Sequence, residues 1–346
     1  MQTYRLAVIG FGAVGQGLAQ ILRDQGDELA RRFGARFQIV AICDPRVGSI
    51  YDPAGLRPAE LLGAIRADGN LSRVAAPARH WDAESTIAES NADVVAELSY
   101  TDLRSGEPAL SYMQLALNLG KHVVTTNKGP IALHYSELSA LACAHGVEIG
   151  AEGTVMSGTP TVRFGQELLA AAGIQRIQGI LNGTTNYMLA RMEAGATYAE
   201  ALADAQARGY AEADPEGDVE GHDTAGKLVI LANLLMGIPL TLPDVDCQGM
   251  THLSVEDIAA ARADGQRWKL LGCVEACDRQ ISASVRLSRL PLSHPLAAVG
   301  GATNAITFTT GLLGDVTLIG PGAGRLETGY ALICDLLAIH RKADRQ

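Results

Sequence analysis

A glycine-rich turn near the N-terminus constrains the fold more than any other feature of the sequence. It follows a short apolar run that ends at Ile9, and a helical pattern continues from it to about Phe33. In such a strand–turn–helix, successive glycines make the tight turn, admit a pyrophosphate close to the backbone, and let the helix pack closely on the sheet. N–H groups at the helix start then face the phosphate charge. The pattern predicts that a dinucleotide binds at Gly10, Phe11, Gly12, Ala13, Val14 and Gly15.

The segments after this turn alternate between strand-like and helical patterns. Short runs rich in Val and Ile occur at 37–43, 93–98 and 121–125, and helical patterns occupy 106–119 and 135–145. Strands that are apolar throughout are covered on both faces, as in a parallel sheet with right-handed helical crossovers. We therefore expect an α/β fold with a Rossmann-type doubly wound parallel sheet.

The character of the sequence changes near residue 150. The chain has 346 residues, and at roughly 150 residues per domain this length indicates two domains. Strand-like runs at 176–181, 280–287, 305–310 and 315–319 lack regular helices between them. This arrangement favours an α+β domain with a mixed or antiparallel sheet, which is suited to contact between subunits of a homodimer.

A second glycine-rich turn lies close to the C-terminus. It spans 320–324 and precedes an apolar helical pattern at 326–339, so the chain is expected to return to its first domain there. Gly322 of this turn could face the cofactor. The sequence therefore predicts a NAD(P)-binding domain at 1–150 that is rejoined by 321–346, and a substrate-binding and dimerisation domain at 151–320.

Residues that follow two of the strands are candidates for cofactor contacts. Asp44 follows the run 37–43, where an acidic residue can accept a hydrogen bond from a ribose 2′-OH and favour NAD. Arg46 could instead pair with the 2′-phosphate of NADP, so both cofactors remain open. Thr101, beyond the carboxyl end of the third strand, is also assigned to the cofactor.

An acidic segment at 209–227 precedes a buried helix. Asp223 is a candidate N-cap, and Lys227, four residues later, falls on the same helical face. A lysine in a buried helix could exchange a proton with a substrate alcohol or carbonyl, and Glu212 and Asp218 would suit a substrate with an ammonium group. The alternative is a solvated acidic loop that caps a helix.

Three further polar segments are candidates for the site. Lys128 directly follows a strand of the parallel sheet, which places it toward the nicotinamide, although it could be an exposed turn lysine. Asn182 opens a polar turn that could cap a helix or line the cleft. Glu152 opens a loop whose turned-in carbonyls could bind a hard cation through oxygen.

Taken together, these segments resemble homoserine dehydrogenase, the oxidoreductase that links L-homoserine and L-aspartate 4-semialdehyde. The resemblance spans nearly the whole chain, and its most specific part is the block 209–227. It implies that Lys227 is the proton donor and acceptor at the substrate's C4 oxygen, with Asp223 orienting it. It also implies that Glu212 and Asp218, together with Asp223 and Lys128, contact the substrate, and that Lys128 lies beside both nicotinamide and hydroxyl.

The same resemblance implies a monovalent cation site, usually described as sodium. Its ligands would be Glu152 and the backbone carbonyls of Val155, Ser157 and Thr159. Where the family commonly has glycines, this chain has Met156-Ser157. Many bacterial members carry a C-terminal ACT domain that this short chain is expected to lack, so feedback inhibition by threonine is not expected.

Composition excludes several other classes of function. The formal net charge of −10 opposes binding to nucleic acid and to anionic membranes. No apolar stretch reaches the roughly 20 residues of a membrane span. The first strand begins almost at Met1, so we expect no signal peptide and a cytoplasmic protein. The remaining alternatives are a dehydrogenase of another small amino or hydroxy acid and a non-catalytic NAD(P)-binding sensor.

Overall fold

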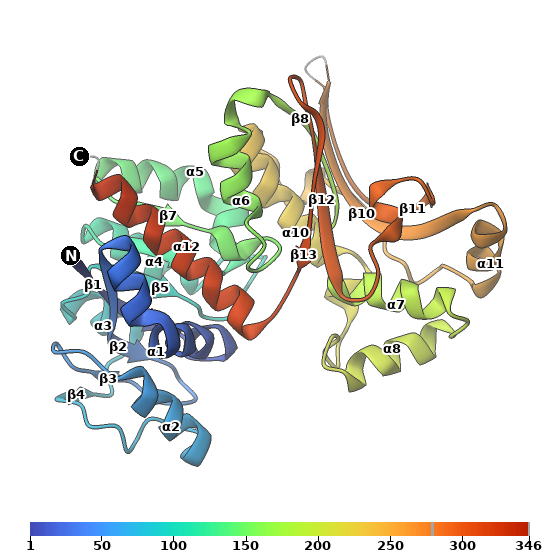
Figure 1. Cartoon of the computed structure of the whole chain (residues 1–346). Helices are drawn as coiled ribbons and strands as arrows, with labels where there is room; N and C mark the ends of the chain where they lie inside the picture. The colour runs from blue at the N-terminus through green and yellow to red at the C-terminus, as the bar shows by residue number, and fades with distance from the viewer. Residues whose placement is uncertain (278–279, 345–346) are drawn as a thin grey trace. The chain divides into compact units, whose positions relative to one another are not determined.

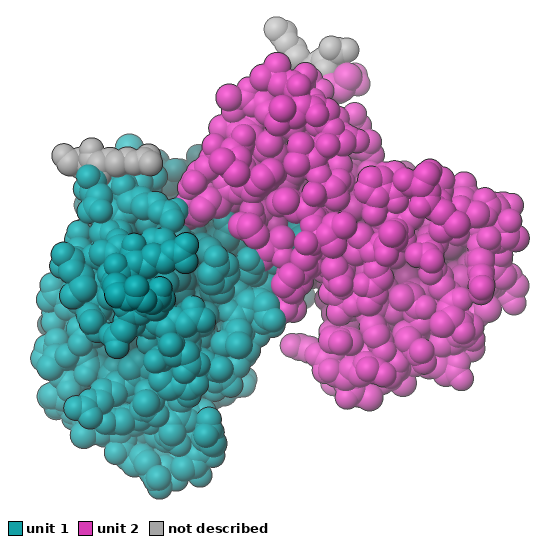
Figure 2. Space-filling model, viewed as in Figure 1, with its two compact units in different colours: residues 1–158, 324–346 teal, residues 159–323 magenta. Residues whose placement is uncertain are grey.

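A computed structural model describes residues 1–277 and 280–344 and divides the chain into two compact units. Unit 1 comprises 1–158 and 324–346, and unit 2 comprises 159–323 (Figure 2). Unit 2 is thus inserted into the sequence of unit 1. Within the described residues, no helix combines the length and the apolar character needed to cross a membrane.

Unit 1 is built on a seven-stranded sheet of order β4-β3-β2-β1-β5-β6-β7, in which β2, β1, β5, β6 and β7 are parallel (Figure 1). The order reverses between β1 and β5, where ligands bind beyond the carboxyl ends of the strands in folds of this kind. Its strands are β1 Gln2–Ile9, β2 Ala35–Cys43, β3 Ile50–Tyr51, β4 Ala78–Arg79, β5 Val94–Glu97, β6 His122–Thr125 and β7 Ile149–Gly150. Its helices are α1 Ala13–Phe33, α2 Pro58–Asp68, α3 Ala83–Glu89, α4 Ala109–Asn118, α5 Lys128–Ala144 and α12 Arg325–Ala343.

The two ends of the chain pack together in the core of unit 1. Helices α1 and α12 lie side by side (Figure 1), and a side chain at Gly17 would overlap the carbonyl oxygen of Arg325. Tyr4 of β1 and the buried His340 of α12 are hydrogen bonded at 3.2 Å between Oη and Nδ1. Apolar residues of β1, β2, α1 and α12 complete this core, among them Leu6, Val8, Leu18, Ile39, Leu332 and Leu336.

Unit 2 contains a six-stranded sheet of order β13-β12-β8-β10-β11-β9, in which only the β9–β11 pair is parallel. Helices α7, α10 and α11 pack against β10. Its strands are β8 Ile174–Ile180, β9 Asp246–Cys247, β10 Gln266–Cys277, β11 Gln280–Pro291, β12 Thr303–Thr310 and β13 Gly314–Pro321. Its helices are α6 Thr161–Arg163, α7 Gly183–Glu193, α8 Tyr198–Ala207, α9 Glu216–Val219, α10 His222–Leu231 and α11 Val255–Ala263, and single π-helical turns continue α6 and α10.

Helix α5 and strand β10 are among the elements that differ from the sequence-based expectations. Helix α5 begins at Lys128, earlier than the predicted residue 135, because Pro130 falls in its first turn, where a missing N–H costs no hydrogen bond. The helix is kinked at His134. Strand β10 was not predicted, since its buried Lys269 and central Gly272 interrupt the apolar pattern.

Candidate functional site

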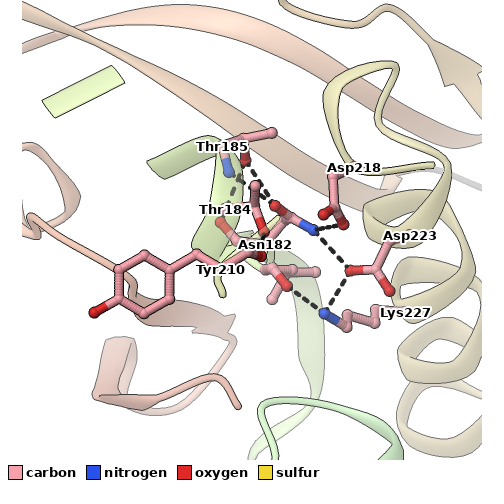
Figure 3. A network of polar contacts seen from close by, with 8 residues as sticks. Asn182, Thr184, Thr185, Tyr210, Asp218, Asp223 and Lys227 are labelled. Carbon is pink, nitrogen blue, oxygen red and sulfur yellow. Dashed lines mark hydrogen bonds and ion pairs between the residues drawn. The ribbon is translucent and has the colours of Figure 1, made fainter. Parts of the chain in front are cut away.

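A cluster of polar side chains lies beyond the end of β8 in unit 2 (Figure 3). Lys227 Nζ donates to Asp223 Oδ2 at 2.6 Å and to the carbonyl oxygen of Leu181 at 2.7 Å. Asn182 Nδ2 donates to the same Asp223 oxygen at 3.0 Å and to Asp218 Oδ1 at 2.7 Å. Three of the residues proposed from the sequence, Lys227, Asp223 and Asp218, are therefore joined, and the unassigned Asn182 joins them.

Helix α10 holds the two ends of the Lys227–Asp223 pair. Every residue from Thr224 to Leu231 is buried, and the Lys227 side chain is only 10% exposed. The expected N-cap role of Asp223 is wrong: the helix begins after Gly221, which has a φ of 86°, and Asp223 is its second residue. Its carboxylate therefore points along the helix to Lys227, one turn away.

Asn182 caps a helix, which is one of the two roles left open by the sequence, and it also bridges two carboxylates. Its Oδ1 caps α7 by accepting from the backbone N–H of Thr185 at 2.9 Å, and its Nδ2 bridges Asp218 and Asp223. An amide can do this because it carries both an acceptor and two donors. The cap fixes the orientation of the amide, so the two carboxylates are held in a defined geometry.

The cluster has a negative balance, with two carboxylates against one ammonium. Burial raises the pKa of Asp218 above its ordinary value, and the charge of Asp223 raises it further, while Asn182, Thr184 and Lys227 oppose the shift. Such an arrangement can bind a cationic group. Glu212 is not part of this hydrogen-bonded cluster: its side chain is exposed, in a segment anchored by the bond from Thr184 Oγ1 to the Tyr210 carbonyl at 2.6 Å.

The glycine-rich turn of unit 1 has the geometry of a dinucleotide site. Gly10 has a φ of 94°, and a side chain there would overlap the carbonyl oxygen of Leu98. A Cβ on Gly12 would meet no atom within 4 Å, so this face of the turn is open, and no side chain caps α1 there. A Cβ on Gly15 would lie 2.8 Å from the Gly10 carbonyl oxygen. Space for a phosphate and exposed helix N–H groups therefore coincide at Gly12.

Asp44 braces this turn. Its Oδ2 accepts from the N–H of Phe11 at 2.7 Å, and its Oδ1 accepts from the N–H groups of Arg46 and Val47 at 2.8 and 3.0 Å. Three backbone donors thus occupy most of the lone pairs of a carboxylate that is almost fully buried. The Arg46 side chain is exposed beside it.

Lys128 occupies the first position of α5, at the carboxyl end of β6. Its predecessor Asn127 is the N-cap, with Oδ1 accepting from Gly129 N at 3.1 Å. Asn127 also donates to the Tyr100 carbonyl at 2.9 Å, and Thr101 follows in the exposed loop after β5. Glu97, the last residue of β5, is fully buried beside them, and burial raises the pKa of its carboxyl. Sequence reasoning missed Glu97 because it reads as part of an apolar strand.

The proposed cation ligands lie in the loop after β7. Glu152 is buried, and its N–H donates to Asp335 of α12 at 3.0 Å. Met156 and Ser157 both have positive φ values, 56° and 54°, which are rare outside glycine, so this backbone adopts a glycine-like conformation without glycine. The Thr159 carbonyl, in contrast, already accepts from the N–H and the hydroxyl of Thr161, which leaves it poorly suited to bind a cation.

Gly322, the remaining predicted cofactor residue, lies at the end of the β12–β13 hairpin. A side chain at Gly322 would overlap the carboxamide of Asn304, which is fully buried and has no hydrogen-bond partner within the described part of the chain. A buried amide without partners is costly, which makes Asn304 a second polar residue that the sequence did not reveal.

Comparison with known proteins gives a consistent result. The family model for homoserine dehydrogenase matches residues 160–337, and the model for the homoserine dehydrogenase NAD binding domain matches 10–152. An NAD(+)-dependent homoserine dehydrogenase of Pseudomonas canavaninivorans is 47% identical over 100% of this chain and 99% of its own.

Solved structures agree with these matches. A crystal structure of a homoserine dehydrogenase from Thiobacillus denitrificans has a TM-score of 0.87 and 31% identity, covering 99% of this chain and 74% of its own. A hyperthermophilic archaeal homoserine dehydrogenase mutant in complex with NADPH has a TM-score of 0.84 and 29% identity, covering 98% of both chains.

Proposed function

The chain belongs to the homoserine dehydrogenase family, and from that premise we propose how its residues divide the work of the reaction. It is an NAD(P)-dependent oxidoreductase that interconverts L-homoserine and L-aspartate 4-semialdehyde. In the oxidative direction, a hydride leaves C4 of homoserine for the nicotinamide, and the hydroxyl proton must leave for a base.

Lys227 exchanges that proton. The observation that supports this role is its geometry: two of the three N–H groups are directed to Asp223 and to the Leu181 carbonyl. The remaining position on Nζ faces the substrate oxygen: as a neutral amine, Lys227 accepts the hydroxyl proton there in the oxidative direction, and as an ammonium it returns the proton in the reductive direction. Asp223 and Asn182 are positioning residues that hold the lysine, since each is bonded to the other and Asp223 is bonded to Lys227.

Asp218 receives the ammonium group of the amino acid. It is half-buried and accepts from Asn182 in the same hydrogen-bonded cluster, in which the ammonium of Lys227 pairs with Asp223. Glu212, on an exposed segment, would have to turn toward the cluster to share this role. The substrate is thus held at its amino end by carboxylates and at its oxygen by Lys227.

Unit 1 binds the dinucleotide. The pyrophosphate lies on the open face at Gly12, the nicotinamide end extends to the carboxyl ends of β5 and β6, and Lys128 and Thr101 lie at those strand ends. Glu152 and the Val155 and Ser157 carbonyls remain the proposed sodium ligands.

Two copies form a homodimer through unit 2, in which β13 is a sheet edge with the exposed apolar residue Ile319.

The role of Lys227 is tested with Lys227→Ala. We expect kcat for homoserine oxidation to fall by on the order of 10² to 10⁴, the range for a lost acid–base group, at an unchanged dinucleotide Kd. Lys269→Met is the matched control, because Lys269 is a buried lysine of unit 2 that bonds to Asn186 and Val299 and not to the cluster. Undiminished turnover in Lys227→Ala would show that Lys227 does not exchange the proton.

A further inference from the structure

Glu97 is the centre of a buried network that the reaction described above does not use. It ends β5 with no exposed surface, and it has no ion pair among the described residues. Its Oε1 accepts from the Ser99 N–H at 2.9 Å and from the Ser99 hydroxyl. Thr125 Oγ1 donates to the Glu97 backbone carbonyl at 2.8 Å and lies 3.3 Å from Glu97 Oε2. Burying a carboxyl group costs free energy unless hydrogen bonds compensate for the lost water, so these contacts are needed to hold Glu97 in place.

One side of this network reaches the dinucleotide turn. The Ser99 contacts fold the Leu98–Ser99 peptide back over Glu97, and that peptide lies directly against Gly10. The Leu98 N–H also donates to the Ile9 carbonyl at 2.7 Å. The positive φ of Gly10 brings the turn into contact with this peptide, so a shift of Leu98 would be transmitted to the glycine-rich turn.

The other side of the network reaches Lys128. Thr125 Oγ1, next to Glu97, accepts from the Asn127 N–H at 2.9 Å, and the Asn127 amide donates to the carbonyls of Ser99 and Tyr100 at 3.4 and 2.9 Å. Asn127 in turn caps α5 through Gly129. The start of the helix that bears Lys128 is thereby fixed by the turn that Glu97 holds.

We propose that Glu97 is a positioning residue that couples the glycine-rich dinucleotide turn to Lys128. It fixes the turn 98–100, which packs on Gly10 and receives the Asn127 amide. The kinetic part of this inference rests on the proposed role of Lys128, whereas the coupling itself does not.

The coupling is tested by amide hydrogen exchange in Glu97→Leu, which keeps the buried volume but offers no acceptor. The N–H groups of Ser99, Asn127 and Gly129 all bond to side chains of the network, so their exchange should accelerate at least tenfold. In Glu97→Gln, whose carbonyl can still accept from Ser99, exchange should stay within about threefold of the parent. Unchanged exchange at Asn127 and Gly129 in Glu97→Leu would overturn the proposal.

Asp93→Asn is the matched control. Asp93 precedes the other end of β5 and bonds to Arg5, so the substitution disturbs the same strand away from the turn. It should leave the three amides unaffected. If Glu97→Leu does not fold, Ser99→Ala replaces it, because this change removes only the hydroxyl contact with Glu97 and should still accelerate exchange at Asn127.

A double-mutant cycle with Lys128→Ala tests the kinetic part. At saturating dinucleotide, Glu97→Leu should lower kcat about tenfold or more, and should lower it no further once Lys128 is absent. Additive losses would show that Glu97 does not act through Lys128. Full turnover in Lys128→Ala alone would refute the proposed role of Lys128, and hydrogen exchange would still decide whether Glu97 fixes both the turn 98–100 and the start of α5.

Discussion

Two buried lysines of unit 2 differ in the groups that surround them, and only Lys227 is proposed to react. Lys227 has a carboxylate partner, whereas Lys269 bonds only to neutral acceptors, Asn186 Oδ1 at 2.9 Å and the Val299 carbonyl at 2.5 Å. Burial lowers the pKa of Lys269 to about 8. Asn186 also donates to the carbonyls of Val299 and Gly301, so Lys269 helps to hold that loop on β10.

Lys269 should make the free energy of unfolding depend on pH in the alkaline range. Its pKa is 10.5 when unfolded and about 8 when folded, so between these values the unfolded chain binds more protons. The free energy of unfolding should therefore rise with pH in this window, by about 3 kcal/mol at most, relative to Lys269→Met. Urea unfolding of both proteins from neutral pH to about pH 10 measures the difference. Parallel profiles for the two proteins would contradict the assignment.

Asp218 should make KM for homoserine depend on pH in the acidic range. Because burial raises its pKa above 3.8, it takes up a proton at a higher pH than an ordinary aspartate. A protonated Asp218 no longer pairs with an ammonium group, so KM for homoserine should rise as the pH falls through that pKa. Asp218→Asn should have a high KM at neutral pH and lack the acid rise. A variant profile that parallels the parent would assign the titration to another group.

The sequence could not predict the roles of residues whose hydrogen-bond partners lie far away along the chain. The Asp223–Lys227 pair is predictable, because a spacing of four places both on one helical face. Asn182 lies 36 and 41 residues from its partners Asp218 and Asp223, and its bridging role depends on how the start of α7 meets α9 and the start of α10. Glu97 likewise gains its contact with Thr125 only when β5 and β6 pair.

At the scale of elements, local signals decided what could be predicted. Helix α1 has a clear apolar face and ends at Gly34, whose φ of 74° is typical of a helix C-cap, and its predicted extent is confirmed. Strand β10 was missed because its polar Lys269 is buried by tertiary contacts that no local pattern contains. The N-cap of α10 was misplaced because Gly221, not an acidic residue, begins that helix.

The glycine-rich turn offers a matched pair of substitutions. Gly10→Ala forces a side chain into positive φ and into the Leu98 carbonyl, so it should destabilise the protein by about 2 to 4 kcal/mol. Gly12→Ala meets no atom of the protein and should change stability by less than about 1 kcal/mol, yet weaken dinucleotide binding at least tenfold, because the new methyl occupies the pyrophosphate's space. Thermal unfolding and fluorescence titration with NADH separate the two effects. Equal dinucleotide affinity in Gly12→Ala and in the parent would show that the pyrophosphate does not bind at this face.

At the scale of the whole molecule, the edge of the unit 2 sheet bears on assembly. Strand β13 pairs only with β12 among the described strands, and Leu312, Leu313 and Ile319 on this hairpin are each more than half exposed. An apolar edge strand of this length is a template for pairing with a second copy. The antiparallel character of this sheet was predictable from its strand-rich sequence, but which strand forms the edge depends on topology.

The proposed homodimer is tested by sedimentation of Ile319→Lys. A charge on the edge should raise the dimer dissociation constant at least tenfold relative to the parent. Leu292→Lys is the control, since Leu292 is equally exposed, at 58% against 57%, but lies outside the hairpin. A dimer that is equally stable in parent and Ile319→Lys would place the subunit contact on another surface.

The insertion of unit 2 into unit 1 has a consequence for biosynthesis. Residues 1–158 leave the ribosome first, but the partner of α1 is α12, and the Tyr4–His340 bond joins residues 336 positions apart. At roughly 5 to 20 residues per second, the roughly 290 residues between α1 and α12 take about 15 to 60 s to make. Throughout that interval the face of α1 that packs on α12 has no partner. The first part of the protein to be synthesised is therefore among the last to complete its packing.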